Sequence, residues 1–144
     1  MTVSAMEVAE MLGGARTLGR RVGTLTELRR AVEEGLPVES LDAVAGYLSV
    51  NDVEASTLKY RIVPKTTLRR RTRLSPEESE RTERLARLAT LAEHVWEDPG
   101  LAREFLTSTQ PQLGDERPID LARTDLGARE VEELLMRIEY ALPV

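Results

Sequence analysis

Seven basic side chains and no acidic one lie between residues 59 and 74, although the whole chain has a formal net charge of −5. The basic residues of this segment are Lys59, Arg61, Lys65, Arg69, Arg70, Arg71 and Arg73. The segments before and after it carry net charges of −4 and −8. Clustered lysine and arginine can bind the phosphates of nucleic acids, because each neutralised phosphate releases a counterion. The alternative interpretation is a solvated charge run between two domains.

Two threonines lie among these cations, in a segment that we predict to be a short basic helix over residues 65–71. In a helix-turn-helix unit, side chains near the start of the recognition helix reach base edges, and cations at its end hold phosphates. The residues predicted to contact DNA are Lys65, Thr66, Thr67, Arg69, Arg70, Arg71 and Arg73. Leu68 is expected to hold this helix to the core. Tyr60 is the one aromatic residue between residues 59 and 74, which disfavours single-strand or RNA recognition by base stacking.

Side chains for catalysis or metal binding are scarce. The sequence has no cysteine, which excludes disulfides, thiolate metal sites and a cysteine nucleophile. His94 is the single histidine, so a Ser-His-Asp triad or a multi-histidine metal centre would have to be built around it. We expect it to pack or face solvent near the end of a helix. We therefore predict no catalytic residue, no metal and no cofactor, with a small hydrolase using His94 or a carboxylate pair as the enzyme alternative.

The remaining composition is typical of a globular protein. The 144 residues are 41% hydrophobic and 31% charged, enough for one domain or two small ones. No apolar run approaches the ~20 residues that span a bilayer, and the acidic N-terminus does not resemble a secretory signal. We therefore expect a cytoplasmic protein that does not enter a membrane.

Helical periodicity and capping signals predict an all-α fold. Thr24 and Glu27 form a capping-box pattern, and Gly35 marks the end of the helix that they start. The residues expected on the buried faces of this helix and the next one are Leu25, Leu28, Val32, Leu41, Val44 and Leu48. A third helix is predicted over residues 52–61, although several residues there favour strands. Three helices before residue 73, the last one short and basic, fit a helix-turn-helix layout.

A second domain is predicted to begin with Ser-Pro-Glu-Glu at residues 75–78, which reads as a cap, an N1 proline and a capping-box glutamate. The residues expected on the apolar faces of its two longest helices are Leu85, Leu88, Leu91 or Ala92, Val95, Val131, Leu134, Leu135 and Ile138. Gly127 is expected to allow close packing and Asp120 to cap a helix. The predicted domains are residues 1–73 and residues 74–144.

Several motifs of the second half have fixed spacings. They are RLSPEES at 73–79, RLARL at 84–88, Trp96 shortly before Asp98, PQLGDERPIDL at 111–121 and VEELLMRIEYALPV at the end. This pattern resembles the toxin-binding domain of the Xre/MbcA/ParS family of antitoxins. Upstream, GLPVESLDAVAGYL and IVPKTTLRRR resemble the Xre-like helix-turn-helix half of the same proteins.

The resemblance implies an antitoxin of a type II toxin–antitoxin pair. Its partner would be a RES-domain toxin that depletes NAD. The C-terminal segment of the antitoxin would approach or cover the NAD pocket of the toxin. The N-terminal half would bind the promoter of its own operon as a homodimer and repress it. The residues assigned to the toxin interface are Arg137, Tyr140, Leu142, Pro143 and Val144, an arginine and an aromatic anchor followed by an apolar tip.

Two alternatives stay open. The apolar tail could fold back over its own helix. The whole chain could be a stand-alone helix-turn-helix regulator whose acidic half dimerises or binds another effector. A toxin gene beside this gene would favour the antitoxin, and an isolated gene would favour the regulator.

Overall fold

The computed structural model describes residues 3–141, and within them the fold is all-α, as predicted. No β-strand forms in this part of the chain, and none of its helices is both long and apolar enough to cross a bilayer. The helices of the N-terminal bundle are α1 (Ala5–Met11), α2 (Gly14–Leu18), α3 (Leu25–Glu34), α4 (Val38–Leu48), α5 (Asp52–Ile62) and α6 (Lys65–Arg70). The elements that follow are α7 (Pro76–Trp96), α8 (Pro99–Thr107), the 3-10 turn η1 (Pro111–Leu113), α9 (Pro118–Leu121) and α10 (Asp125–Glu139).

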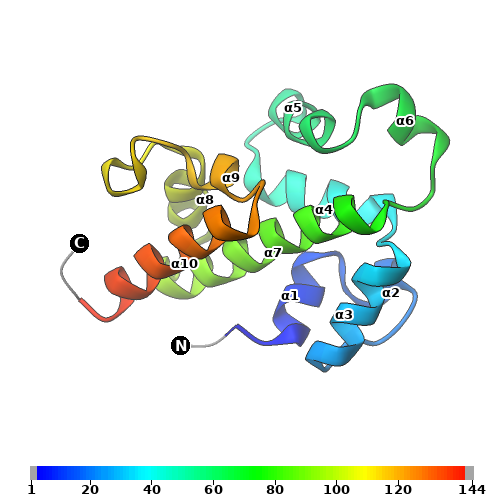
Figure 1. Ribbon diagram of the computed structural model, residues 1–144, viewed down its shortest axis with the longest axis horizontal. Coiled ribbons are helices and arrows are strands. Elements are labelled where there is room, and N and C mark those ends of the chain that lie inside the picture. Colours follow the sequence, from blue (N-terminus) through cyan, green and yellow to red (C-terminus); the bar gives the residue numbers. More distant parts are fainter. Residues whose placement is uncertain (1–2, 142–144) are drawn as a thin grey trace.

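Both parts of the chain pack on α7 (Figure 1). The helices α1, α3 and α4 contact it from the N-terminal part, and α8 and α10 contact it from the C-terminal part. Its buried face contains Leu85, Leu88 and Leu91, as predicted. Ala86 and Ala89 are also fully buried, and their small side chains let neighbouring helices approach. One continuous hydrophobic core therefore joins the two parts.

Side-chain caps set the first residues of α3 and α7. Thr24 and Ser75 accept hydrogen bonds from the backbone N–H groups of Glu27 and Glu78, both at 3.1 Å. The Glu78 carboxylate accepts the Ser75 N–H at 2.7 Å, which completes the capping box. These two helix starts were predicted from the same residues.

Gly127 brings α9 and α10 close together, as predicted. A Cβ atom at this position would lie 2.0 Å from the carbonyl oxygen of Leu121. Only glycine leaves room for that carbonyl, so Gly127 fixes how the start of α10 lies against the end of α9.

Two side-chain predictions are wrong. Leu25 is 76% exposed, because it lies in the first turn of α3 at the edge of the buried stripe formed by Leu28 and Val32. Asp120 does not act as a helix cap. Its carboxylate instead accepts hydrogen bonds from the guanidinium groups of Arg117 and Arg61, and the second of these belongs to a distant helix.

Candidate functional site

The helices α5 and α6 are joined by Val63 and Pro64 (Figure 1), in the layout that the sequence predicted for a helix-turn-helix unit. The Asn51 side chain accepts the N–H of Glu54 at 2.9 Å and so starts α5 where the sequence predicted a helix. Val63 is fully buried, whereas Leu68 is partly buried against the core, as predicted. None of the six residues Lys65–Arg70 is fully buried. The turn is therefore anchored in the core, and α6 is presented at the surface.

Most side chains of α6 that were predicted to contact DNA face solvent. The exposed ones are Lys65, Thr66, Arg69 and Arg70, and Thr67 is half-buried. The ammonium group of Lys65 lies 5.9 Å from the ring centre of Tyr60. Neither Arg69 nor Arg70 forms an ion pair with any residue between 3 and 141. Their guanidinium groups are therefore available to an external anion.

The last two predicted DNA contacts, Arg71 and Arg73, bind other parts of the chain. Arg71 donates to the Glu78 carboxylate at 2.8 Å, and Arg73 donates to the carbonyl of Gly35 at 2.8 Å. Their contact with DNA stays a prediction. Burial by itself raises the pKa of Glu78, but hydrogen bonds from Arg71 and Ser75 outweigh it and hold that pKa below 4.5. The hydrogen bond from Glu78 raises the pKa of Arg71.

The second predicted surface lies at the end of α10. Val131, Leu134 and Leu135 are buried, in the helix that packs on α7, and Arg137 and Tyr140 are exposed near its end. The other residues assigned to the toxin interface lie outside the described residues; they are Leu142, Pro143 and Val144. The end of α10 and the helix α6 lie at opposite ends of the long axis of the molecule (Figure 1). The two candidate surfaces are therefore well separated.

The single histidine connects α7 to α1. Its Nε2 pairs with the carboxylate of Glu7, which also accepts the backbone N–H of Ser4 at 3.1 Å. The hydrogen bonds from Ser4 and from His94 hold the pKa of Glu7 below 4.5. No group of three or more histidine, aspartate or glutamate side chains within residues 3–141 could hold a metal ion. His94 thus makes a contact between two helices.

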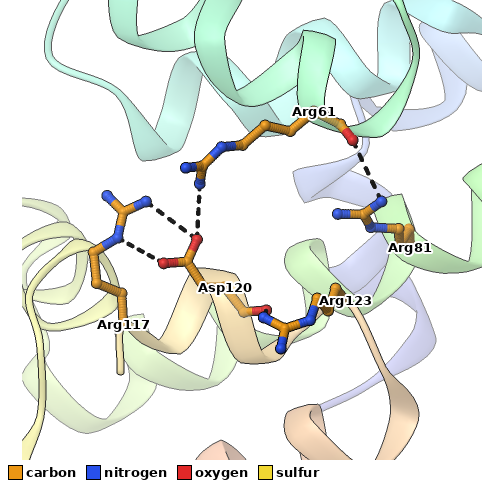
Figure 2. A network of polar contacts seen from close by, with 5 residues as sticks. All are labelled: Arg61, Arg81, Arg117, Asp120 and Arg123. Carbon is orange, nitrogen blue, oxygen red and sulfur yellow. Dashed lines mark hydrogen bonds and ion pairs between the residues drawn. The ribbon is translucent and has the colours of Figure 1, made fainter. Parts of the chain in front are cut away.

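One polar cluster was not predicted from the sequence. Figure 2 shows its members, which we call the arginine cluster: Arg61, Arg81, Arg117, Asp120 and Arg123. Asp120 is central, because it accepts from Arg117 Nε and from Arg61 Nη1, both at 2.9 Å. Arg61 lies in α5 and is 59 positions from Asp120 in the chain. No local sequence pattern could indicate a contact over that separation.

Comparison with known proteins gives two adjacent matches. Residues 27–87 match a family described as the antitoxin Xre-like helix-turn-helix domain. Residues 91–141 match the antitoxin Xre/MbcA/ParS C-terminal toxin-binding domain. The antitoxin Xre of Yersinia enterocolitica is 31% identical over 132 residues, which cover 88% of this chain and 88% of that protein. The first match thus contains the α5–α6 unit, the second contains α10, and both reach into α7.

Proposed function

The chain belongs to the Xre/MbcA/ParS family of antitoxins, and we propose that it neutralises a RES-type, NAD-degrading toxin by covering the active site of that toxin. We propose further that it binds the promoter of its own operon as a homodimer and represses it. One observation carries the proposal: a helix-turn-helix match and a toxin-binding match occur in the same chain, side by side.

Occlusion of a nucleotide pocket requires no chemistry from the inhibitor. It requires a rigid docking face and a small segment that reaches the cleft. Packing of α10 on α7 supports the rigid part of this proposal. Arg137 and Tyr140 are exposed near the end of α10, and arginine and aromatic side chains are typical anchors of interface cores. We assign the covering segment to the residues that follow them, Leu142, Pro143 and Val144.

The proposed DNA contact is α6. A homodimer would place two such helices on two half-sites of an operator. In this arrangement Lys65, Thr66 and Thr67, in the first turn, face base edges, and Arg69 and Arg70 hold phosphates. The exposure of these arginines supports the assignment.

The decisive experiment measures intracellular NAD in cells that express the product of the neighbouring gene, with and without this protein. We expect NAD to collapse with the neighbouring product alone and to recover on co-expression. A constant NAD level would overturn the pairing with an NAD-degrading toxin. The exposed basic helix would then make a DNA-binding regulator the better account.

A further inference from the structure

The arginine cluster lines a cleft that contains more positive than negative charge (Figure 2). The cleft has a volume of about 420 Å³ and lies between α5, α7 and the segment around α9. Its charged lining residues are Arg61, Arg81, Arg123, Asp120 and Glu116. Arg117 borders it through its hydrogen bonds to Asp120. Four guanidinium groups are thus opposed by two carboxylates, one of which, Glu116, is exposed to solvent.

The carboxylate of Asp120 already has its partners. It accepts from Nε and Nη2 of Arg117 at 2.9 and 3.1 Å, and from Nη1 of Arg61 at 2.9 Å. Burial by itself raises its pKa, but the bonds and charges of these two arginines outweigh burial and hold the pKa below 3.8. Asp120 is therefore an internal anion shared by Arg117 and Arg61, and it forms no ion pair with the other two arginines of the cluster.

Among the described residues, the guanidinium groups of Arg81 and Arg123 have only backbone carbonyls as partners. Arg81 donates to the carbonyl of Arg61 at 3.4 Å, and Arg123 donates to the carbonyl of Asp120 at 3.2 Å. Neither forms an ion pair with a carboxylate in the described part of the chain. Burial, together with the charges of Arg84, Arg123 and Arg61, lowers the pKa of Arg81. Positive groups therefore repel one another here, and an anion would relieve that repulsion.

We propose that this cleft binds a phosphate group, held by Arg81 and Arg123, with Arg61 as a ligand shared with Asp120. Guanidinium groups suit this role because their planar forks donate pairs of hydrogen bonds to phosphate oxygens. The apolar part of the lining strengthens such bonds by lowering the local dielectric constant; it includes Leu58, Ile62, Leu85 and Ile119. The phosphate belongs either to a small phosphate compound or to the backbone of DNA held by α5 and α6.

Titration with inorganic phosphate and pyrophosphate tests the site on the full chain. At constant ionic strength, with chloride as the reference anion, we expect saturable heat release and a higher melting temperature. The double variant Arg81→Gln/Arg123→Gln should lose both responses. The charge-matched control Arg16→Gln/Arg21→Gln changes two exposed arginines outside the cleft and should keep both. Circular dichroism of each variant verifies that it is folded.

A second variant separates an anion site from a merely structural cluster. Asp120→Asn removes the internal anion that competes for Arg61 and Arg117. In an anion site it should therefore tighten phosphate binding. A folded Asp120→Asn protein that binds phosphate more weakly would count against the proposal, because the carboxylate would then be needed to organise the cluster.

Binding to a duplex of the chain's own promoter distinguishes the two sources of phosphate. If the phosphate is that of DNA, the Arg81→Gln/Arg123→Gln variant should reduce the slope of log affinity against log salt by about 1 to 2. If the ligand is a small phosphate compound, this slope stays the same while phosphate binding is lost. The proposal is overturned if the variant changes neither the salt dependence of DNA binding nor the binding of phosphate. The phosphate titration requires no toxin and no promoter, so its outcome is separate from that of the proposed function.

Discussion

Four arginines at and after the end of α6 are close in sequence but differ in what they contact. They are Arg69, Arg70, Arg71 and Arg73. Arg71 pairs with Glu78 and Arg73 with a backbone carbonyl, whereas the first two face solvent. A guanidinium that is already bonded within the chain must give up that bond, or share it, to hold a phosphate. We therefore expect Arg69 and Arg70 to make the larger contribution to DNA affinity.

Replacing both Arg69 and Arg70 by glutamine should weaken promoter binding and reduce the slope of log affinity against log salt by about 2, because two phosphate contacts are lost. Fluorescence anisotropy over a range of salt concentrations measures this slope. The Arg16→Gln/Arg21→Gln protein is the charge-matched control. Toxin binding should stay intact in both variants. An unchanged slope would show that α6 does not hold the phosphates.

Glu78 gives the stability a defined pH dependence. Its pKa in the folded protein lies below 4.5 because Arg71 and the Ser75 N–H stabilise the carboxylate. The stabilisation is therefore present above the ordinary pKa of a glutamate and is lost as the pH falls through the lower, folded-state pKa. Glu78→Gln should reduce the free energy of unfolding at neutral pH by about 0.5–1.5 kcal/mol, since the pair is partly solvent-screened.

Urea unfolding at neutral pH and at about pH 3.5 tests this dependence. The difference in unfolding free energy between the two pH values should be smaller in Glu78→Gln than in the wild type. Glu77→Gln is the matched control, because it removes an exposed carboxylate from the same helical turn. Equal pH dependence in wild type and Glu78→Gln would mean that this carboxylate has the same pKa in the folded and unfolded chain.

At the scale of helices, the first residue of a helix could be predicted because it depends on residues that are close in sequence. The capping box at Ser75 and Glu78 gives the first turn of α7 by itself. The same box at Ser4 and Glu7 starts α1, a local signal that our prediction did not use. The exposed Leu25 shows the limit of periodicity. Periodicity indicates which face of a helix is buried, but not how far other helices cover the two ends of that face.

Contacts between different helices could not be predicted in this way. The pairs Arg61–Asp120 and Arg71–Glu78 use charged residues that look like ordinary surface positions in the sequence. Which arginine of a basic run finds a carboxylate depends on how α5, α7 and α9 are placed by the core. The position of α6 followed from the sequence, but the division of its neighbouring arginines into bonded and exposed ones did not.

The contact between α9 and α10 should be sensitive to a single methyl group. Gly127→Ala should lower the free energy of unfolding by about 1–3 kcal/mol, because its Cβ must displace the Leu121 carbonyl. Gly46→Ala is the control, since it lies within α4 with nothing inside 4 Å of an added Cβ. It should instead stabilise the protein by about 0.5–1 kcal/mol. Thermal and urea unfolding measure the free energy of unfolding of both variants. Equal changes in Gly127→Ala and Gly46→Ala would contradict the close approach at Gly127.

For the whole molecule, the main consequence is that one helix supports both candidate surfaces. The segment that matches the helix-turn-helix family ends at residue 87, and the segment that matches the toxin-binding family begins at residue 91, both inside α7. The hydrophobic core is continuous across α7, while α6 and the end of α10 lie far apart (Figure 1). A ligand bound at one of these surfaces therefore need not obstruct the other surface.

Removal of residues 140–144 should separate inhibition from folding. The buried residues of α10, Val131, Leu134 and Leu135, remain in the truncated chain, so its melting temperature should change little. Inhibition of the toxin should weaken more than about tenfold, because an aromatic interface anchor typically contributes about 2 kcal/mol or more. The NAD consumption of purified toxin, titrated with each antitoxin variant, measures the loss. Leu126→Ala serves as the control, since Leu126 is 69% exposed at the opposite end of α10. A truncated protein that inhibits as well as the full chain would place the occluding surface elsewhere on the toxin-binding domain, with the tail covering its own helix instead.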